Sequence, residues 1–96
     1  MVGNEIVELL RAHKAEIMSR FGVASLALFG SFARDQATEQ SDVDILARFE
    51  EPATSKQYFG VQFYLEDLLG RDVDLVTEKA LREELRARIE REAVHV

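Results

Sequence analysis

The stretch GSFARDQATEQSDVD, from Gly30 to Asp44, contains the features on which the fold and the chemistry of this chain depend. Gly30 has no Cβ, so the backbone there can approach a phosphate closely. Ser31 follows at the expected start of a helical turn, where free N–H groups attract anions. Asp42 and Asp44 lie two apart on an expected strand, so both carboxylates leave one face, roughly 7 Å apart along the backbone. Because Mg²⁺ binds carboxylates together with substrate phosphates, this combination indicates metal-assisted nucleotidyl transfer.

Outward from this stretch, apolar spacing predicts three strands separated by helices. The expected strands are 23–29, 42–49 and 71–77, and the expected helices are 5–21, 55–69 and 79–93, with a helical turn at 32–35. Asn4 is the expected N-cap of the first helix, and Gly22 and Gly70 are expected to end helices. This order predicts an α/β fold, a small mixed three-stranded sheet with helices packed on it. No interior linker indicates a second domain.

Composition limits the possible partners of this chain. Its 96 residues are expected to form one small domain, too short to enclose both a nucleotide and a large acceptor. The formal net charge of −6 argues against direct nucleic-acid binding. The absence of cysteine excludes disulfides and thiolate metal sites, and it fits a cytoplasmic protein. Charges interrupt the first expected helix, which excludes a signal peptide or a membrane span there.

A second acid pair, Asp72 and Asp74, repeats the acid–valine–acid pattern on the next expected strand. Either pair alone is also typical of a solvated strand edge, and Gly30–Ser31 alone is also typical of a strand-to-helix turn with a capping serine. If the two strands are neighbours, several carboxylates converge near that turn. Like charges so close are unfavourable unless a cation or a proton joins them, and a divalent metal resolves the conflict.

The two later helices have different surface patterns. In the helix expected at 55–69, Phe59 and Phe63 lie off the main apolar face. They either form an exposed patch that a partner covers, or they pack under the first or last helix. In the helix expected at 79–93, Leu81, Leu85 and Ile89 are expected to point inward, and the charged residues to form a solvated face.

These motifs resemble the DNA polymerase β-like nucleotidyltransferase superfamily, whose signature has a Gly-Ser pair, ten residues and then Asp-x-Asp. The chain is most similar to the minimal nucleotidyltransferase branch. Its matching positions are Arg34, Ala37, Ser41 and Asp42, for the branch's A-R-G-x-A and S-D-x-D, and Asp74-Leu75-Val76 for its third-acid strand. The C-terminal LREELRARIEREAVHV resembles the branch's last helix and tail. The resemblance implies a single polymerase β-like nucleotidyltransferase domain over residues 1–96.

The resemblance also implies roles for individual residues. Gly30 and Ser31 would bind the β- and γ-phosphates of ATP, and Arg34 would contact phosphate or the acceptor. The expected catalytic and metal-binding acids are Asp42, Asp44 and Asp74. Asp42 and Asp44 would hold two Mg²⁺ ions, with Mn²⁺ as a possible substitute. Asp74 would complete the metal site on the nucleophile side and help to deprotonate the acceptor hydroxyl.

Members of this branch are often paired with a helical HEPN-domain protein, commonly a ribonuclease toxin. The resemblance therefore implies an antitoxin that transfers AMP from ATP to a tyrosine of its toxin within a hetero-oligomer. Asp35 departs from the branch, which usually has glycine there. Aspartate tolerates a positive φ, but it adds negative charge near the phosphates. Two alternatives stay open: an idle site in an antitoxin that acts by contact alone, and nucleotide transfer to a small molecule.

Overall fold

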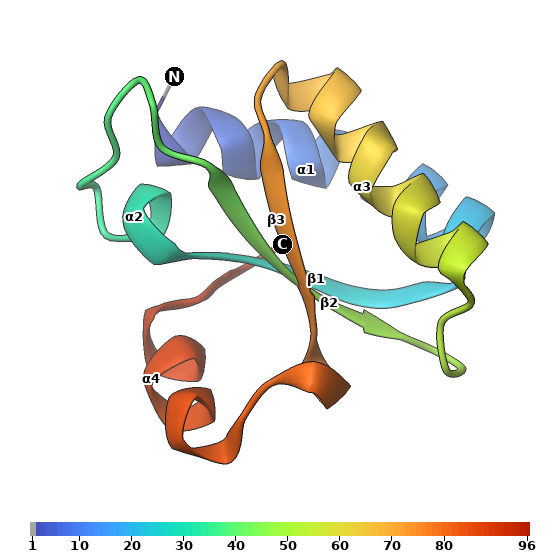
Figure 1. The fold of residues 1–96 in the computed structure, drawn as a ribbon. Coiled ribbons are helices and arrows are strands. Elements are labelled where there is room, and N and C mark those ends of the chain that lie inside the picture. Colours follow the sequence, from blue (N-terminus) through green and yellow to red (C-terminus); the bar gives the residue numbers. More distant parts are fainter. Residues whose placement is uncertain (1) are drawn as a thin grey trace.

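A mixed four-stranded sheet with helices on both faces organises residues 2–96, the part of the chain that the computed structural model describes (Figure 1). The elements follow in the order α1 (Gly3–Phe21), β1 (Val23–Phe29), α2 (Gly30–Ala33), β2 (Val43–Phe49), α3 (Ser55–Leu69), β3 (Val73–Thr77), the 3-10 helix η1 (Glu78–Ala80), α4 (Glu83–Glu92) and β4 (Val94–His95). In the sheet order β3-β2-β1-β4, β1 is antiparallel to both neighbours and β2 is parallel to β3. The predicted mixed α/β fold is confirmed, and residue 1 of the predicted domain lies outside the described part.

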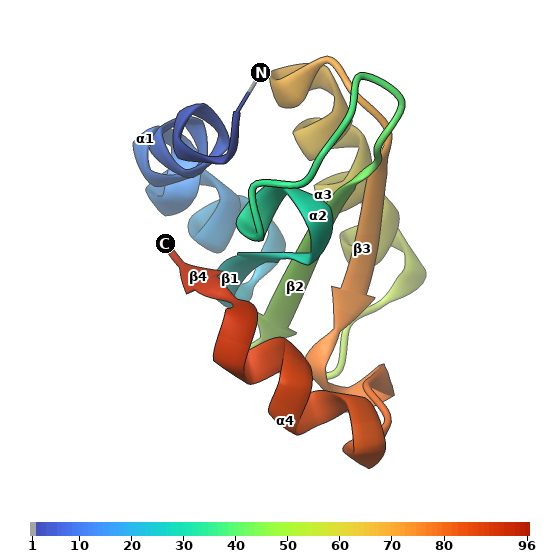
Figure 2. The same cartoon turned by 90° about the vertical axis from the view of Figure 1, so that its left-hand side faces the viewer.

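The predicted strand count of three is wrong, because β4 adds a fourth strand at the free edge of β1 (Figure 2). His95 pairs with Ala27 and Val94 pairs with Leu28. The N–H of Val96 donates to the carbonyl oxygen of Leu26 at 3.2 Å, which extends the contact by one residue. A strand this short is created by the edge it pairs with, so its own sequence pattern does not reveal it.

Alternation along the strands gives the sheet two different faces. One face packs against α1 and α3, which Figure 1 shows above the sheet, and this face forms the main core. Its largest fully buried side chains are Ile6, Leu10, Ile17, Val23, Leu26, Leu28, Val43, Ile45, Val61 and Leu65. The other face carries a smaller core under α4, made by Ala27, Phe29, Leu46, Leu81 and Ile89. Because α4 covers only part of this second face, Asp44 and Asp74 on it remain accessible to solvent.

Glycine ends two helices as predicted, but the start of α1 differs from the prediction. Gly22 and Gly70 follow α1 and α3 in the left-handed conformation, with φ of 70° and 65°. Asn4 lies inside α1, and Val2 is the N-cap. The Glu5 carboxylate accepts a hydrogen bond from the Val2 N–H at 3.1 Å, so a side chain of the first turn supplies the cap.

The last helix starts later than predicted, because the chain first turns through η1. The Thr77 hydroxyl oxygen accepts a hydrogen bond from the Ala80 N–H at 3.3 Å, and α4 begins only at Glu83. Leu81, in the turn before the helix, packs in the smaller core together with Ile89. Leu85 in the first turn of α4 is left 42% exposed, which corrects the prediction that it points inward.

Phe59 and Phe63 form an exposed patch on α3, which resolves the two possibilities that the sequence left open. The two residues are 49% and 61% exposed, and their rings stack with centroids 6.3 Å apart. Among the helices between residues 2 and 96, none has the length and apolarity that crossing a membrane requires.

Candidate active site

The predicted site residues gather where β1 ends and where β2 and β3 begin. Gly30 directly follows β1, and Phe29 beside it is the register partner of Asp44 in β2. Asp44 in turn pairs in register with Asp74 in the parallel strand β3. Register partners on neighbouring parallel strands lie about 4.8 Å apart and point to the same face of the sheet. The structure therefore places Gly30, Asp44 and Asp74 side by side.

Gly30 fits against Asp44 so closely that a side chain at this position has no room. A Cβ on Gly30 would lie 1.9 Å from Oδ2 and 2.8 Å from Cγ of Asp44. Gly30 also has a φ of +75°, in the left-handed region that favours glycine. The missing side chain thus permits the contact between the turn after β1 and the Asp44 carboxylate.

The remaining predicted residues surround this contact. Ser31 follows Gly30 in α2, and Arg34 caps the C-terminal end of that short helix. Asp42 is exposed just before β2. Asp35 adopts a φ of 59°, so the position that departs from the family pattern does require a positive φ. Aspartate is among the residues that tolerate this conformation best.

Burial of the carboxyl and the negative charges around it raise the pKa of Asp44 to about 6. Burial of the carboxyl contributes most, followed by the charges of Asp74 and Asp42, while the Arg34 guanidinium lowers this pKa and Glu92 raises it. A partly buried carboxylate facing like charges is destabilised in its ionised form. The site therefore carries more negative charge than its own cation balances.

A pH-dependent cost in stability follows from this shift. The Asp44 carboxyl has a pKa of about 6 in the folded chain and 3.8 as a free group. Between these values the folded state holds more protons than the unfolded state, so stability falls as the pH rises through this window. Asp44→Asn removes the titrating group. In EDTA, we expect the variant and the wild type to have similar melting temperatures near pH 3.5–4. At pH 7 the melting temperature of the variant should be several degrees above that of the wild type.

Melting temperatures measured from pH 3.5 to 8 test this expectation. Asp72→Asn is the charge-matched control, because Asp72 is an exposed acid on the segment that leads into β3. Exposed substitutions of this kind usually change stability by about 0.5 kcal/mol or less. An Asp44→Asn variant that melts below the wild type at pH 7 would contradict the crowding of charges at this site.

The donor chemistry of the site fits a hard divalent cation. Within residues 2–96, no three Asp, Glu, His or Cys side chains stand close enough to hold an ion unaided. Mg²⁺, however, is usually held by one or two carboxylates and by substrate phosphates rather than by a protein cage. Asp44 and Asp74 supply two carboxylates on neighbouring strands. After burial, the charge of Asp74 contributes most to the raised pKa of Asp44, and a cation between the two would relieve this repulsion.

Glu92, at the C-terminal end of α4, belongs to this site although the sequence placed it on a solvated face. Its carboxylate accepts hydrogen bonds from Arg34 Nη1 at 3.2 and 3.0 Å and from the Gly30 N–H at 3.3 Å. Its side chain is only 17% exposed. Its sequence spacing to Gly30 and Arg34 carries no signal for this contact, because α4 meets α2 only in the folded chain.

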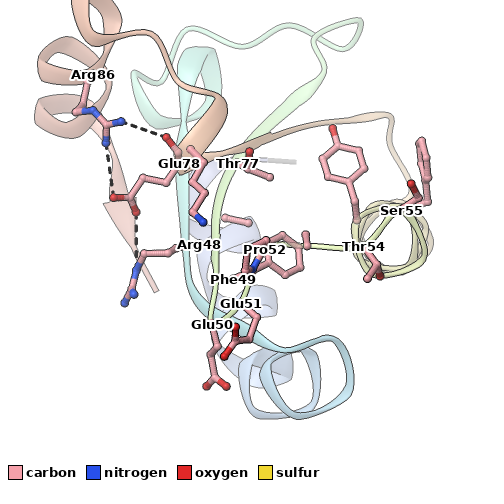
Figure 3. Close-up of a pocket in the computed structure, with 15 residues that line it drawn as sticks. Arg48, Phe49, Glu50, Glu51, Pro52, Thr54, Ser55, Thr77, Glu78 and Arg86 are labelled. Atoms are coloured by element: carbon pink, nitrogen blue, oxygen red, sulfur yellow. Dashed lines mark hydrogen bonds and ion pairs between the residues drawn. The ribbon is translucent and has the colours of Figure 1, made fainter.

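A separate pocket lies at the opposite end of β2 (Figure 3). It lies between the segment 48–55, the start of α3 and η1, and Tyr58 and Phe59 line it. On one side of the pocket, the Glu78 carboxylate forms ion pairs with two arginines, with Arg48 Nε at 3.8 Å and with Arg86 Nη1 at 3.6 Å. The six predicted site residues lie elsewhere, so this pocket is distinct from the candidate active site.

The fold and the site together define a nucleotidyltransferase. A model of the nucleotidyltransferase domain family matches residues 10–96, and the chain belongs to this family. It is 45% identical over 92 residues to the protein adenylyltransferase MntA of Thermococcus cleftensis, covering 96% of this chain and 93% of that relative. The resemblance to nucleotidyltransferases is thereby confirmed, and the chain is an enzyme of this class.

Solved structures agree with this assignment. One described as a minimal nucleotidyltransferase has a TM-score of 0.77 and 38% identity, and the match covers 98% of this chain and 95% of that chain. The fold also matches a chain in the structure of a tri-AMPylated Shewanella oneidensis HEPN toxin in complex with MNT antitoxin. That match has a TM-score of 0.60 and 22% identity over 97% of this chain and 66% of that chain. At this identity the likeness concerns the fold alone.

Proposed function

We propose that this chain is a Mg²⁺-dependent protein adenylyltransferase that transfers AMP from ATP to a tyrosine hydroxyl of a HEPN-domain toxin, and so acts as its antitoxin. The observation that carries the proposal is the register pair Asp44–Asp74, set directly against the Gly30 turn. Two carboxylates beside a backbone that can approach a phosphate closely are what phosphoryl chemistry needs. The 45% identical relative MntA is a protein adenylyltransferase, which supports a protein as the acceptor.

The reaction forms one phosphorus–oxygen bond and breaks one, and a proton moves from the acceptor hydroxyl to a base. The tyrosine oxygen attacks the α-phosphorus of ATP, the bond from that phosphorus to the oxygen bridging to the β-phosphate breaks, and pyrophosphate leaves with that oxygen. The hydroxyl proton passes to a nearby carboxylate, for which Asp74 is the candidate because it is exposed beside Asp44. The products are an O-adenylylated tyrosine and pyrophosphate.

Some residues of the chain would orient the phosphates of ATP, and others would neutralise the negative charge that these phosphates carry. Gly30 and Ser31 would hold the β- and γ-phosphates, and the Arg34 guanidinium would neutralise part of their charge. Two Mg²⁺ ions, held by Asp42, Asp44 and Asp74 together with the phosphates of ATP, would stabilise the attacking and leaving oxygens. The exposed aromatic pair Phe59 and Phe63 supports a protein partner, because stacked rings in solvent form a surface that association covers.

Incubation with ATP labelled at the α-phosphate tests this function directly. The chain, its co-purified HEPN-domain partner and Mg²⁺ are mixed, and the partner is expected to acquire the label as AMP on tyrosine. Mass spectrometry identifies the modified residue. A partner that binds the chain but remains unlabelled with the wild-type enzyme, with Mg²⁺ or with Mn²⁺, would contradict the proposal.

Metal binding is tested separately by thermal stability. A ligand that binds only the folded state raises the melting temperature, by about 10 °C or more when its concentration is about 100 times its Kd. We therefore expect Mg²⁺ or Mn²⁺ to stabilise the isolated chain. The double variant Asp42→Asn/Asp44→Asn should lose this shift, and the Asp72→Asn variant should keep it. An equal shift in the double variant would place the metal elsewhere.

Inhibition of the toxin by contact alone is the second candidate function. The observation that favours it is Asp35, whose carboxylate adds negative charge to a turn that would receive phosphates. The two functions differ in one result. A double variant Asp42→Asn/Asp44→Asn that still neutralises the toxin fully indicates contact alone, whereas loss of neutralisation with retained binding indicates transfer.

A further inference from the structure

The Glu92 carboxylate sits on the donors that the proposed function assigns to the nucleotide. Oε1 accepts from the Gly30 N–H at 3.3 Å and from Arg34 Nη1 at 3.2 Å. Oε2 accepts from the same Arg34 nitrogen at 3.0 Å. The contact therefore joins a carboxylate to one backbone donor and one guanidinium, which is also the donor set that a phosphate oxygen would use.

We propose that Glu92 is an internal competitor of the nucleotide, whose carboxylate occupies the phosphate-binding donors until a phosphate displaces it. The inference rests on the proposed function, because it assigns Gly30 and Arg34 to the phosphates. A carboxylate and a phosphate repel each other and cannot share the Gly30 N–H. The apparent affinity for the nucleotide is then reduced by the fraction of chains in which Glu92 blocks the donors.

Displacement requires only the Glu92 side chain to move. The helix that carries it is held in place by Ile89 and Ala93, which pack in the smaller core with Phe29 and Leu46. The backbone after it is paired to β1 through β4. Rotation of the glutamate about its own bonds frees Gly30 and Arg34 while α4 stays in place, so the competition needs no change of fold.

The opposite role for Glu92 makes a different prediction. If the glutamate served to orient Arg34 toward the phosphates, neutralising it would release the guanidinium and weaken nucleotide binding. If it competes, neutralising it strengthens binding. The sign of the change in Kd therefore decides between a competitor and a positioning residue.

The test measures binding of the non-hydrolysable analogue AMP-PNP with Mg²⁺ by isothermal titration calorimetry. Glu92→Gln keeps the shape of the side chain and removes its charge. If Glu92 blocks the donors in about nine wild-type chains out of ten, only about a tenth of the chains can bind the nucleotide at once. Removing the block should then lower the apparent Kd about tenfold. Glu90→Gln is the matched control, because Glu90 lies on the same helix, pairs with Arg86 at 3.9 Å and carries the same charge. Its Kd should equal that of the wild type.

Inorganic tripolyphosphate provides a second probe, which isolates the phosphate donors from base recognition. An unchanged or higher Kd for both probes in Glu92→Gln overturns the inference. If that variant loses its fold, Glu92→Asp replaces it, since the shorter side chain reaches the donors less well. Tighter binding then supports the inference, and unchanged or weaker binding overturns it. Failure of the proposed function would be seen in a different experiment, as a toxin that stays unlabelled. That result does not depend on whether the variant or the wild type binds the probes more tightly.

Discussion

Replacing Asp44 by asparagine is expected to lower the rate of AMP transfer to the toxin by about a thousandfold. The change keeps the shape of the side chain and removes the carboxylate that pairs in register with Asp74. Metal-assisted stabilisation of a transition state supplies several kcal/mol, and each 1.36 kcal/mol corresponds to a factor of about ten in rate. Initial rates of label incorporation at saturating ATP and Mg²⁺ measure the effect.

The controls separate chemistry from folding. Asp44→Asn is expected to be more stable than the wild type without metal at neutral pH, so unfolding would not explain a loss of rate. Asp72→Asn carries the same charge change on the segment before β3 and should transfer AMP at nearly the wild-type rate. A variant Asp44→Asn that retains more than about a tenth of the rate would remove Asp44 from the chemistry.

Replacing Gly30 by alanine is expected to destabilise the fold by about 3 kcal/mol or more and to abolish transfer. Two costs add at this position. Alanine resists the φ of +75°, and its Cβ would lie 1.9 Å from Oδ2 of Asp44. Relief of the clash must move either the turn or the carboxylate, and both belong to the site. Denaturant unfolding measures the stability, and the labelling assay measures the activity.

Gly70 offers a control for the backbone part of this effect. Its φ is +65°, and a Cβ there would meet nothing within 4 Å. Gly70→Ala should therefore cost only the left-handed conformation, about 1–2 kcal/mol, and should leave the activity intact. In the double variant Gly30→Ala/Asp44→Ala the clashing atoms Oδ2 and Cγ are gone, so stability should partly recover. Equal losses for Gly30→Ala and Gly70→Ala would contradict the close contact.

Prediction from sequence succeeded where local residues determine the structure. The strand at 23–29 and the helix at 55–69 have the predicted bounds, since each ends or begins beside a glycine in the left-handed conformation. Asp44 and Asp74 came together as expected, because two acid–valine–acid patterns on adjacent parallel strands share one face. The assignment of roles to these residues remains a prediction.

Prediction failed where distant residues determine the structure. The strand Val94–His95 exists because the edge of β1 accepts it, and the start of α4 depends on the turn that Thr77 caps. In the sequence, Glu92 cannot be distinguished from the other glutamates of its helix, which were predicted to face solvent. Only the packing of α4 against the sheet brings this carboxylate to Gly30, 62 positions earlier in the chain.

The acids of the site also specify how the strands align. Along β2 and β3, Asp44 and Asp74 alternate with the buried residues Val43, Ile45, Val73 and Leu75. A slip of one residue between these strands would turn one aspartate into the apolar core. Burying an unpaired carboxylate there costs several kcal/mol, so misaligned pairings are strongly disfavoured. The charges that crowd this site thereby help to select one register of β2 against β3.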